Sequence, residues 1–126
     1  MTATGNTHRH AFRDYALDGA LLRFHPASGT NVRIENSATQ HLRRVVPRVA
    51  MFGITNLCNR SCDFCSRDVQ RESAWTVASA AQVLRDLSHA GVLEVAFGGG
   101  EPFAFRGFAD LVDELHDTTP LALNVT

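Results

Sequence analysis

The segment from residue 48 to residue 126 alternates regularly between two hydrophobic patterns, one with the short apolar runs of strands and one with helical spacing. In chain order these patterns predict strand 49–54, helix 76–90, strand 92–97, helix 108–116 and strand 121–125. This order is typical of parallel sheets whose strands are joined by right-handed helical crossovers. The sequence therefore predicts an α/β fold for this segment.

The ends of these elements are also marked in the sequence. Thr76 is a suitable N-cap for the first helix, and Gly91 stands where helices commonly end. Residues 49–54 are almost continuously apolar, so we expect this strand to be buried on both faces of the sheet. Residues 121–125 would form an exposed edge strand.

The N-terminal third of the chain differs from the rest. Residues 1–14 are polar and without periodicity, and they predict a disordered leader. Residues 15–47 predict a β-hairpin extension, with strands at residues 20–24 and 31–35. We therefore expect three parts: leader 1–14, hairpin 15–47 and α/β segment 48–126.

Composition narrows the classes of partner. The formal net charge of the 126 residues is −1, so no overall field attracts nucleic acid or an anionic membrane. No apolar run approaches the ~20 residues that span a bilayer, and the N-terminus lacks the apolar core of a secretion signal. Clustered free cysteines fit a reducing compartment. We predict a cytoplasmic protein that binds neither nucleic acid nor a membrane.

All three cysteines of the chain lie close together, directly after the strand at 49–54. Cys58, Cys62 and Cys65 form a C-x3-C-x2-C pattern. Three thiolates on one loop can bind three irons of a [4Fe–4S] cluster and leave the fourth iron open. An odd number of cysteines is a poor disulfide framework. A zinc ion would need a fourth ligand, and no histidine stands at finger-like spacing. Zinc and simple buried thiols remain alternatives at this point.

A second unusual loop, Gly98-Gly99-Gly100-Glu101-Pro102, follows the strand at 92–97. Considered alone, such a run indicates a turn. It lacks the lysine of a P-loop and the glycine spacing of a dinucleotide-binding fingerprint. In parallel α/β folds, ligand sites lie beyond the carboxyl ends of the strands. We therefore expect this run and the cysteines to face the same side of the sheet, next to one another.

Together the two loops resemble the motifs of the radical S-adenosylmethionine (SAM) superfamily. Residues 54–65 are similar to its C-x3-C-x-Φ-C signature, and Gly99-Gly100-Glu101-Pro102 is similar to its Gly-Gly-Glu-Pro motif. The resemblance covers about residues 48–126. It implies the N-terminal half of a partial (β/α)6 barrel core. It also implies an enzyme whose cofactors are a [4Fe–4S] cluster and SAM.

The resemblance further implies roles for individual residues. The three cysteines would ligate the cluster, and the amino and carboxylate groups of SAM would chelate the open iron. Phe64 would pack near the adenine, the Gly99-Gly100-Glu101-Pro102 motif would hold the methionine ammonium group, and Asn124 would reach the cofactor from the last strand. Reduction of the cluster would cleave SAM, and the resulting 5′-deoxyadenosyl radical would abstract hydrogen from the substrate.

The sequence supplies about three strands of such a barrel, so we expect a truncated product, a gene fragment or one piece of a split enzyme, with doubtful activity on its own. The N-terminal hairpin and the Gly-Gly-Gly-Glu-Pro run resemble those of members that modify peptides, which implies a peptide substrate. The resemblance also implies a flavodoxin or ferredoxin as the electron donor. Two other functions stay open. They are a non-catalytic iron–sulfur or metal-binding module and an inactive remnant.

Overall fold

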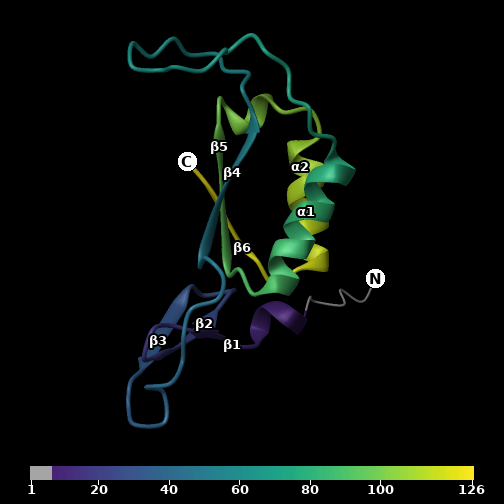
Figure 1. The fold of residues 1–126 in the computed structure, drawn as a ribbon. Helices are drawn as coiled ribbons and strands as arrows, with labels where there is room; N and C mark the ends of the chain where they lie inside the picture. The colour runs from purple at the N-terminus through teal and green to yellow at the C-terminus, as the bar shows by residue number, and fades with distance from the viewer. Residues whose placement is uncertain (1–6) are drawn as a thin grey trace.

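The computed structural model describes residues 7–126, which form two three-stranded sheets and two α-helices (Figure 1). The N-terminal part contains a 3-10 helix and an antiparallel sheet: η1 (Thr7–His10), β1 (Arg13–Ala16), β2 (Leu21–His25) and β3 (Thr30–Ile34). The second part contains β4 (Val49–Thr55), α1 (Val77–Ala90), β5 (Glu94–Gly99), η2 (Pro102–Ala104), α2 (Phe108–Thr118) and β6 (Ala122–Val125). Within residues 7–126, neither α-helix has the length and apolar character that a bilayer crossing requires.

The expected order of parallel strands and helices is confirmed. The second sheet has the order β4-β5-β6, and both pairs of strands are parallel. Figure 1 shows α1 and α2 packed against the same face of this sheet. The buried core between them comprises Ile54, Ala80, Ala81, Leu84, Val92, Val95, Phe97, Phe105, Phe108, Leu111, Leu115 and Leu121. The described strands form an open sheet and not a closed barrel.

Among residues 7–126, no helix covers the opposite face of the parallel sheet, and here one expectation was wrong. Strand β4 is buried on one face only, because Ala50, Phe52 and Ile54 pack in or against the helix-side core. The side chains that alternate with them point to the other face, and Met51 is 78% exposed there. The apolar run at 49–54 is therefore an edge strand with one open face, and its sequence does not distinguish this from a fully buried strand.

The helix boundaries follow the predicted signals. Thr76 caps α1: its hydroxyl accepts from the Ser79 backbone N–H, and the Ser79 hydroxyl accepts in return from the Thr76 N–H. Gly91 ends the helix in the left-handed conformation. An ion pair between Arg85 and Glu114 joins α1 to α2. Helix α1 therefore begins at a fixed position, immediately after the segment that carries the cysteines.

The prediction of a disordered leader fails for its second half. Residues 7–10 form η1, and β1 begins at Arg13, so the extension is a three-stranded sheet and not only a hairpin. The Arg13 guanidinium donates to the carbonyls of Val92 and Ser88, at 2.9 and 3.1 Å, and burial lowers its pKa below the ordinary value. These long-range contacts, which no local pattern reveals, order the segment. The remaining part of the predicted leader, residues 1–6, lies outside the described residues.

The N-terminal sheet packs against the lower end of the parallel sheet in Figure 1, where the strands begin. Tyr15, Leu22 and Phe24 form a second small core with Leu93, the residue just before β5. The Tyr15 hydroxyl also donates to the carbonyl of Val46, in the connection to β4. This sheet therefore covers the amino ends of the parallel strands and leaves their carboxyl ends, where the unusual loops lie, uncovered.

Candidate cofactor site

Two loops form the site at the carboxyl ends of the parallel strands. We call residues 56–75 the cysteine loop and residues 98–102 the glycine turn. The cysteine loop follows β4 and the glycine turn ends β5, which is the direct neighbour of β4 in the sheet. Figure 1 shows both at the upper end of the molecule, opposite the N-terminal sheet. The expectation that the two motifs lie side by side is confirmed.

Backbone hydrogen bonds join the two loops. The Gly100 N–H donates to the carbonyl of Thr55 at 2.6 Å, and the Glu101 N–H donates to the carbonyl of Leu57 at 2.7 Å. The pairing of β4 with β5 shifts by one residue between Gly53 and Thr55, which is the geometry of a β-bulge. The glycine turn is thus attached to the segment that leads directly into Cys58.

Both central glycines of the turn are required by this close approach. Gly99 has a φ of +116°, and a Cβ atom there would lie 2.3 Å from the carbonyl oxygen of Thr55. At Gly100 a Cβ would lie 2.1 Å from the oxygen of Leu57 and 2.5 Å from that of Asn56. Such distances cannot be accommodated without moving the backbone. The glycines therefore serve the contact between the loops, whatever else they contact when a ligand is bound.

Glu101 and Pro102, the last two residues of the glycine turn, begin the short helix η2 that follows β5. The Glu101 carboxylate accepts from the backbone N–H of Phe103 at 3.2 Å and so caps η2. Pro102 is buried at the first position of that short helix, where its missing N–H costs nothing. Glu101 is half-buried. One of its oxygens is occupied by the cap, and a carboxylate has further acceptor positions for a cation.

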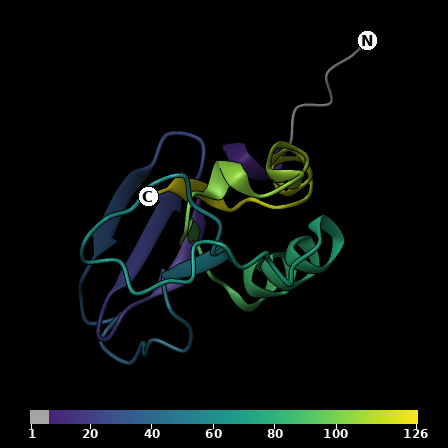
Figure 2. The same cartoon turned by 90° about the horizontal axis from the view of Figure 1, so that it is seen from above.

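The cysteine loop is irregular and exposed. It contains no helix or strand, and Figure 2 shows it crossing above the sheet. Cys58 is half-buried, Cys62 and Cys65 are exposed, and all three are free thiols. The Cys65 N–H donates to the carbonyl of Cys62 at 3.0 Å, and the Cys58 N–H donates to Val69 at 3.4 Å. In the part of the chain that the structure describes, no three metal-ligating side chains are grouped closely enough to hold a metal ion.

Phe64 and Asn124, two further predicted site residues, do not reach the glycine turn. Phe64 is 91% exposed on the cysteine loop. Asn124 is exposed on the open face of β6 and pairs with Ala96 of β5, which places it before the turn along the strand direction. Their predicted contacts with a cofactor remain predictions.

The return part of the cysteine loop contains contacts that the sequence did not indicate. The guanidinium of Arg67 donates to the side-chain oxygen of Asn56 at 3.1 Å. The Ser73 hydroxyl donates to the carbonyl of Ile54 at 2.5 Å and accepts from the Trp75 N–H at 3.0 Å. The Arg67 bond joins the return part of the loop to its beginning, and the Ser73 bond to Ile54 joins its end to β4. Serine and arginine in a polar loop give no sequence signal for such a role.

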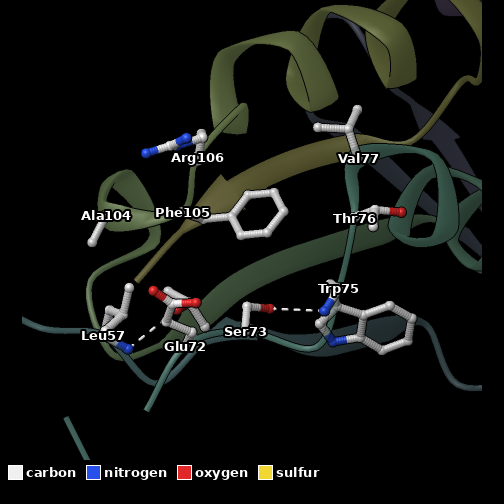
Figure 3. A pocket seen from close by; sticks show the side chains of 10 residues that line it. Leu57, Glu72, Ser73, Trp75, Thr76, Val77, Ala104, Phe105 and Arg106 are labelled. Carbon is white, nitrogen blue, oxygen red and sulfur yellow. Dashed lines mark hydrogen bonds between the residues drawn. The ribbon is translucent and has the colours of Figure 1, made fainter. Parts of the chain in front are cut away.

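A pocket of about 550 Å³ lies beside this return segment, between the starts of α1 and α2. Figure 3 shows its lining side chains, with Arg106 directed away from the Phe105 ring. It is lined by Thr55, Leu57, Glu72, Ser73, Trp75, Thr76, Val77, Ala104, Phe105 and Arg106. Its charged members, Glu72 and Arg106, are both exposed. The sequence did not indicate this pocket, because its lining comes from three separate segments.

Comparison with known proteins decides the family. The model of the radical SAM superfamily matches residues 52–124, which is more than half of the chain. The chain belongs to the radical SAM superfamily. The matched region runs from β4 to β6 and so includes the cysteine loop and the glycine turn.

Three known proteins are similar to this chain, each over only part of its own length. The chain is 33% identical over 75 residues to the PqqA peptide cyclase of Bradyrhizobium diazoefficiens, covering 57% of this chain and 20% of the relative. It is 33% identical over 70 residues to the same enzyme of Rhodopseudomonas palustris, covering 53% and 19%. It is 34% identical over 64 residues to a probable GTP 3′,8-cyclase of Methanocella arvoryzae, covering 49% and 21%. The chain thus matches about a fifth of each relative. No solved structure matches the chain significantly.

The residues present fit the cofactors that a radical SAM protein uses. Three free thiols on one loop, two of them exposed, are the donor set of a [4Fe–4S] cluster whose fourth iron has no protein ligand. The Arg60 N–H already donates to the sulfur of Cys58 at 3.4 Å, the kind of bond that tunes a cluster's potential. The loop is not folded as a ligand cage in the described conformation, so its thiols must converge when a cluster binds.

Proposed function

We propose that this chain binds a [4Fe–4S] cluster through Cys58, Cys62 and Cys65 and binds SAM at the adjacent glycine turn, as part of a radical SAM enzyme. The observation that carries the proposal is the pair of backbone hydrogen bonds from Gly100 and Glu101 to the start of the cysteine loop. These bonds hold the glycine turn against the first residues of the cysteine loop, directly before Cys58. A cluster on one loop and a ligand on the other would therefore be neighbours.

The residues of the chain would divide the work as follows. The three thiolates hold the cluster, and Glu101 accepts charge-assisted hydrogen bonds from the methionine ammonium group. Gly99 and Gly100 let the ligand approach the backbone closely. Phe64 packs against the adenine, and Asn124 contacts the cofactor from β6. When bound and reduced, the cofactor pair supplies a 5′-deoxyadenosyl radical, and the protein positions it and excludes water.

For the substrate we propose a peptide. Support comes from the two similar proteins named as PqqA peptide cyclases, which share a third of the aligned residues with this chain. A small electron-transfer protein such as a flavodoxin or ferredoxin would reduce the cluster. The uncovered carboxyl ends of the strands leave the cysteine loop accessible to such a donor.

Anaerobic reconstitution with iron and sulfide tests the proposal. We expect the full chain to take up a [4Fe–4S] cluster whose reduced electron paramagnetic resonance signal changes when SAM is added. Dithionite reduction with SAM should then release 5′-deoxyadenosine, measured by chromatography. The Cys62→Ala variant, treated identically, provides the background for both readings.

The other outcomes identify the competing functions. A reducible cluster whose signal ignores SAM would contradict the proposal and favour a non-catalytic iron–sulfur module. Zinc binding without any iron–sulfur cluster would assign the cysteines to a metal-binding module. Failure to bind either metal would identify an inactive remnant.

A further inference from the structure

Arg67, on the return part of the cysteine loop, brings a cation close to the neighbouring ends of β4 and β5. Its Nη1 atom lies 4.0 Å from the position that a Cβ of Gly53 would occupy. The same Cβ position is 3.9 Å from the Cα of Gly99. The guanidinium is thus within the immediate surroundings of the strand ends, although Arg67 is fourteen residues beyond Gly53 in the chain.

The guanidinium lies on the open face of the parallel sheet. Gly53 alternates with Phe52 and Ile54, whose side chains belong to the helix side, so the missing Cβ of Gly53 points to the open face. Because Gly53 has no side chain, nothing of its own occupies the space that Arg67 approaches.

Most of the hydrogen-bonding capacity of Arg67 is free for a ligand. A guanidinium carries five N–H donors. In residues 7–126, its side chain makes one hydrogen bond, to the neutral side-chain oxygen of Asn56, and no ion pair with a carboxylate. That bond holds the guanidinium beside Asn56, and no ion pair within residues 7–126 neutralises its charge. An uncompensated guanidinium beside a ligand site is suited to a planar anion such as a carboxylate.

We propose that Arg67 binds the methionine carboxylate of SAM; this inference rests on the proposed function. An α-amino acid carries its ammonium and carboxylate on one carbon, so a site that holds the ammonium must meet the carboxylate a few ångströms away. Glu101 stands on the glycine turn, and Arg67 approaches the same turn past Gly53. Glu101 and Arg67 carry the two opposite charges that the ends of such a zwitterion require.

The experiment compares the binding of two ligands by three proteins, each reconstituted anaerobically as the full chain. The proteins are wild type, Arg67→Gln and Arg71→Gln, and the ligands are SAM and decarboxylated SAM. Arg71 is an exposed arginine of the same loop, so its substitution controls for the loss of one positive charge. Dissociation constants are measured by calorimetry, and cluster content by iron analysis.

We expect Arg67→Gln to weaken SAM binding about tenfold, as for a charge-assisted bond at an exposed site. Arg71→Gln should bind SAM as wild type does. Decarboxylated SAM should bind wild type and Arg67→Gln equally, because the group that Arg67 recognises is gone. An Arg67→Lys variant, which keeps a point charge without the fork, should recover part of the affinity.

Three results would overturn the inference. If Arg67→Gln bound SAM as tightly as wild type does, Arg67 would not bind the carboxylate, and the proposed function would stay intact. An equal loss for both ligands, or loss of the cluster itself, would show that Arg67 only ties the loop to Asn56. Wild type that assembles a cluster but binds no SAM would overturn both the inference and the proposed function.

Discussion

The two halves of the candidate site differ in how completely the folded chain forms them. The glycine turn is fixed by two short backbone hydrogen bonds and by contacts that leave no space for a Cβ atom. The cysteine loop is a long irregular segment whose second and third cysteines are exposed. Contacts within the chain form the glycine turn, whereas within residues 7–126 the thiols of the cysteine loop are not grouped closely enough to hold a metal ion.

Because of this difference, substitutions in the two loops should affect different properties, folding stability in one loop and ligand binding in the other. Substitutions in the glycine turn should act mainly on folding, because they force apart packed backbone segments. Substitutions at the tip of the cysteine loop should act mainly on cofactor binding, since their side chains contribute little buried area.

The largest effect is expected at Cys62. Cys62→Ala removes one of three ligands, so the reconstituted protein should contain no stable [4Fe–4S] cluster by iron content and visible absorption. The free energy of unfolding of the apo-protein should stay within about 0.5 kcal/mol of wild type, as is usual for exposed positions. Urea unfolding can be followed by the fluorescence of Trp75, the single tryptophan. Ser61→Ala, at an exposed neighbour, should retain the cluster.

A Cys62→Ala protein with a full complement of iron would contradict the assignment of the loop tip to cofactor binding. It would mean that Cys62 is not a ligand. A protein that unfolded more easily would instead show that the loop tip supports the fold, against its exposure.

The second largest effect is expected at Gly100. Gly100→Ala would place a methyl group 2.1 Å from the Leu57 oxygen, and we expect a loss of about 3 kcal/mol in unfolding free energy, at the upper end of typical overpacking costs. Gly53→Ala is the matched control, because its nearest neighbours are 3.9 and 4.0 Å away. That variant should be neutral or slightly more stable. Equal stability of the two variants would contradict a preformed glycine turn.

The same division explains what the sequence could predict. Local signals were sufficient for the elements of the α/β segment: the Thr76 cap, Gly91 and the helical spacing of residues 108–116 gave both helices close to their observed bounds. Topology then placed the cysteines beside Gly99 and Gly100, because adjacent parallel strands end at the same edge. These inferences needed only periodicity and strand order.

The missed features all depend on long-range contacts. Strand β1 exists because Tyr15 packs on Leu93 and Arg13 binds carbonyls in the last turn of α1 and just after it, and these partners are far away in the sequence. The open face at Met51 was missed because an apolar strand has the same sequence pattern whether one or both of its faces are covered. The position of Arg67 depends on how an irregular loop folds back, which no propensity describes.

A smaller effect is expected at Ser73, where the cysteine loop returns to the sheet. Ser73→Ala removes the bond to the Ile54 carbonyl and leaves the Trp75 N–H without its acceptor, which should cost about 1–2 kcal/mol. Urea unfolding measures the loss. Ser66→Ala, an exposed serine of the same loop, should be neutral. If both variants match wild type, the loop is not anchored at its return, and the rigid part of the site ends at the glycine turn.

The smallest effect on the fold is expected at Phe64. Because its ring is 91% exposed, Phe64→Ala should change the unfolding free energy by less than about 0.5 kcal/mol. Its proposed contact with the adenine should nevertheless weaken SAM binding about tenfold, since stacking on an aromatic ring contributes roughly 1–3 kcal/mol per base.

Phe103→Ala is the matched control for this last variant. Phe103 is also exposed, but its ring packs edge-on against the ring of Phe108, next to the glycine turn. The two ring centroids are 5.2 Å apart. Phe103→Ala should therefore lose about 1 kcal/mol of stability and keep its affinity for SAM. The opposite responses of two exposed phenylalanines would separate a loop residue that serves the ligand from a turn residue that serves the fold. If Phe64→Ala bound SAM as tightly as wild type, the ring would have no role in the site, and the ligand-binding part of the loop would be limited to its thiols and Arg67.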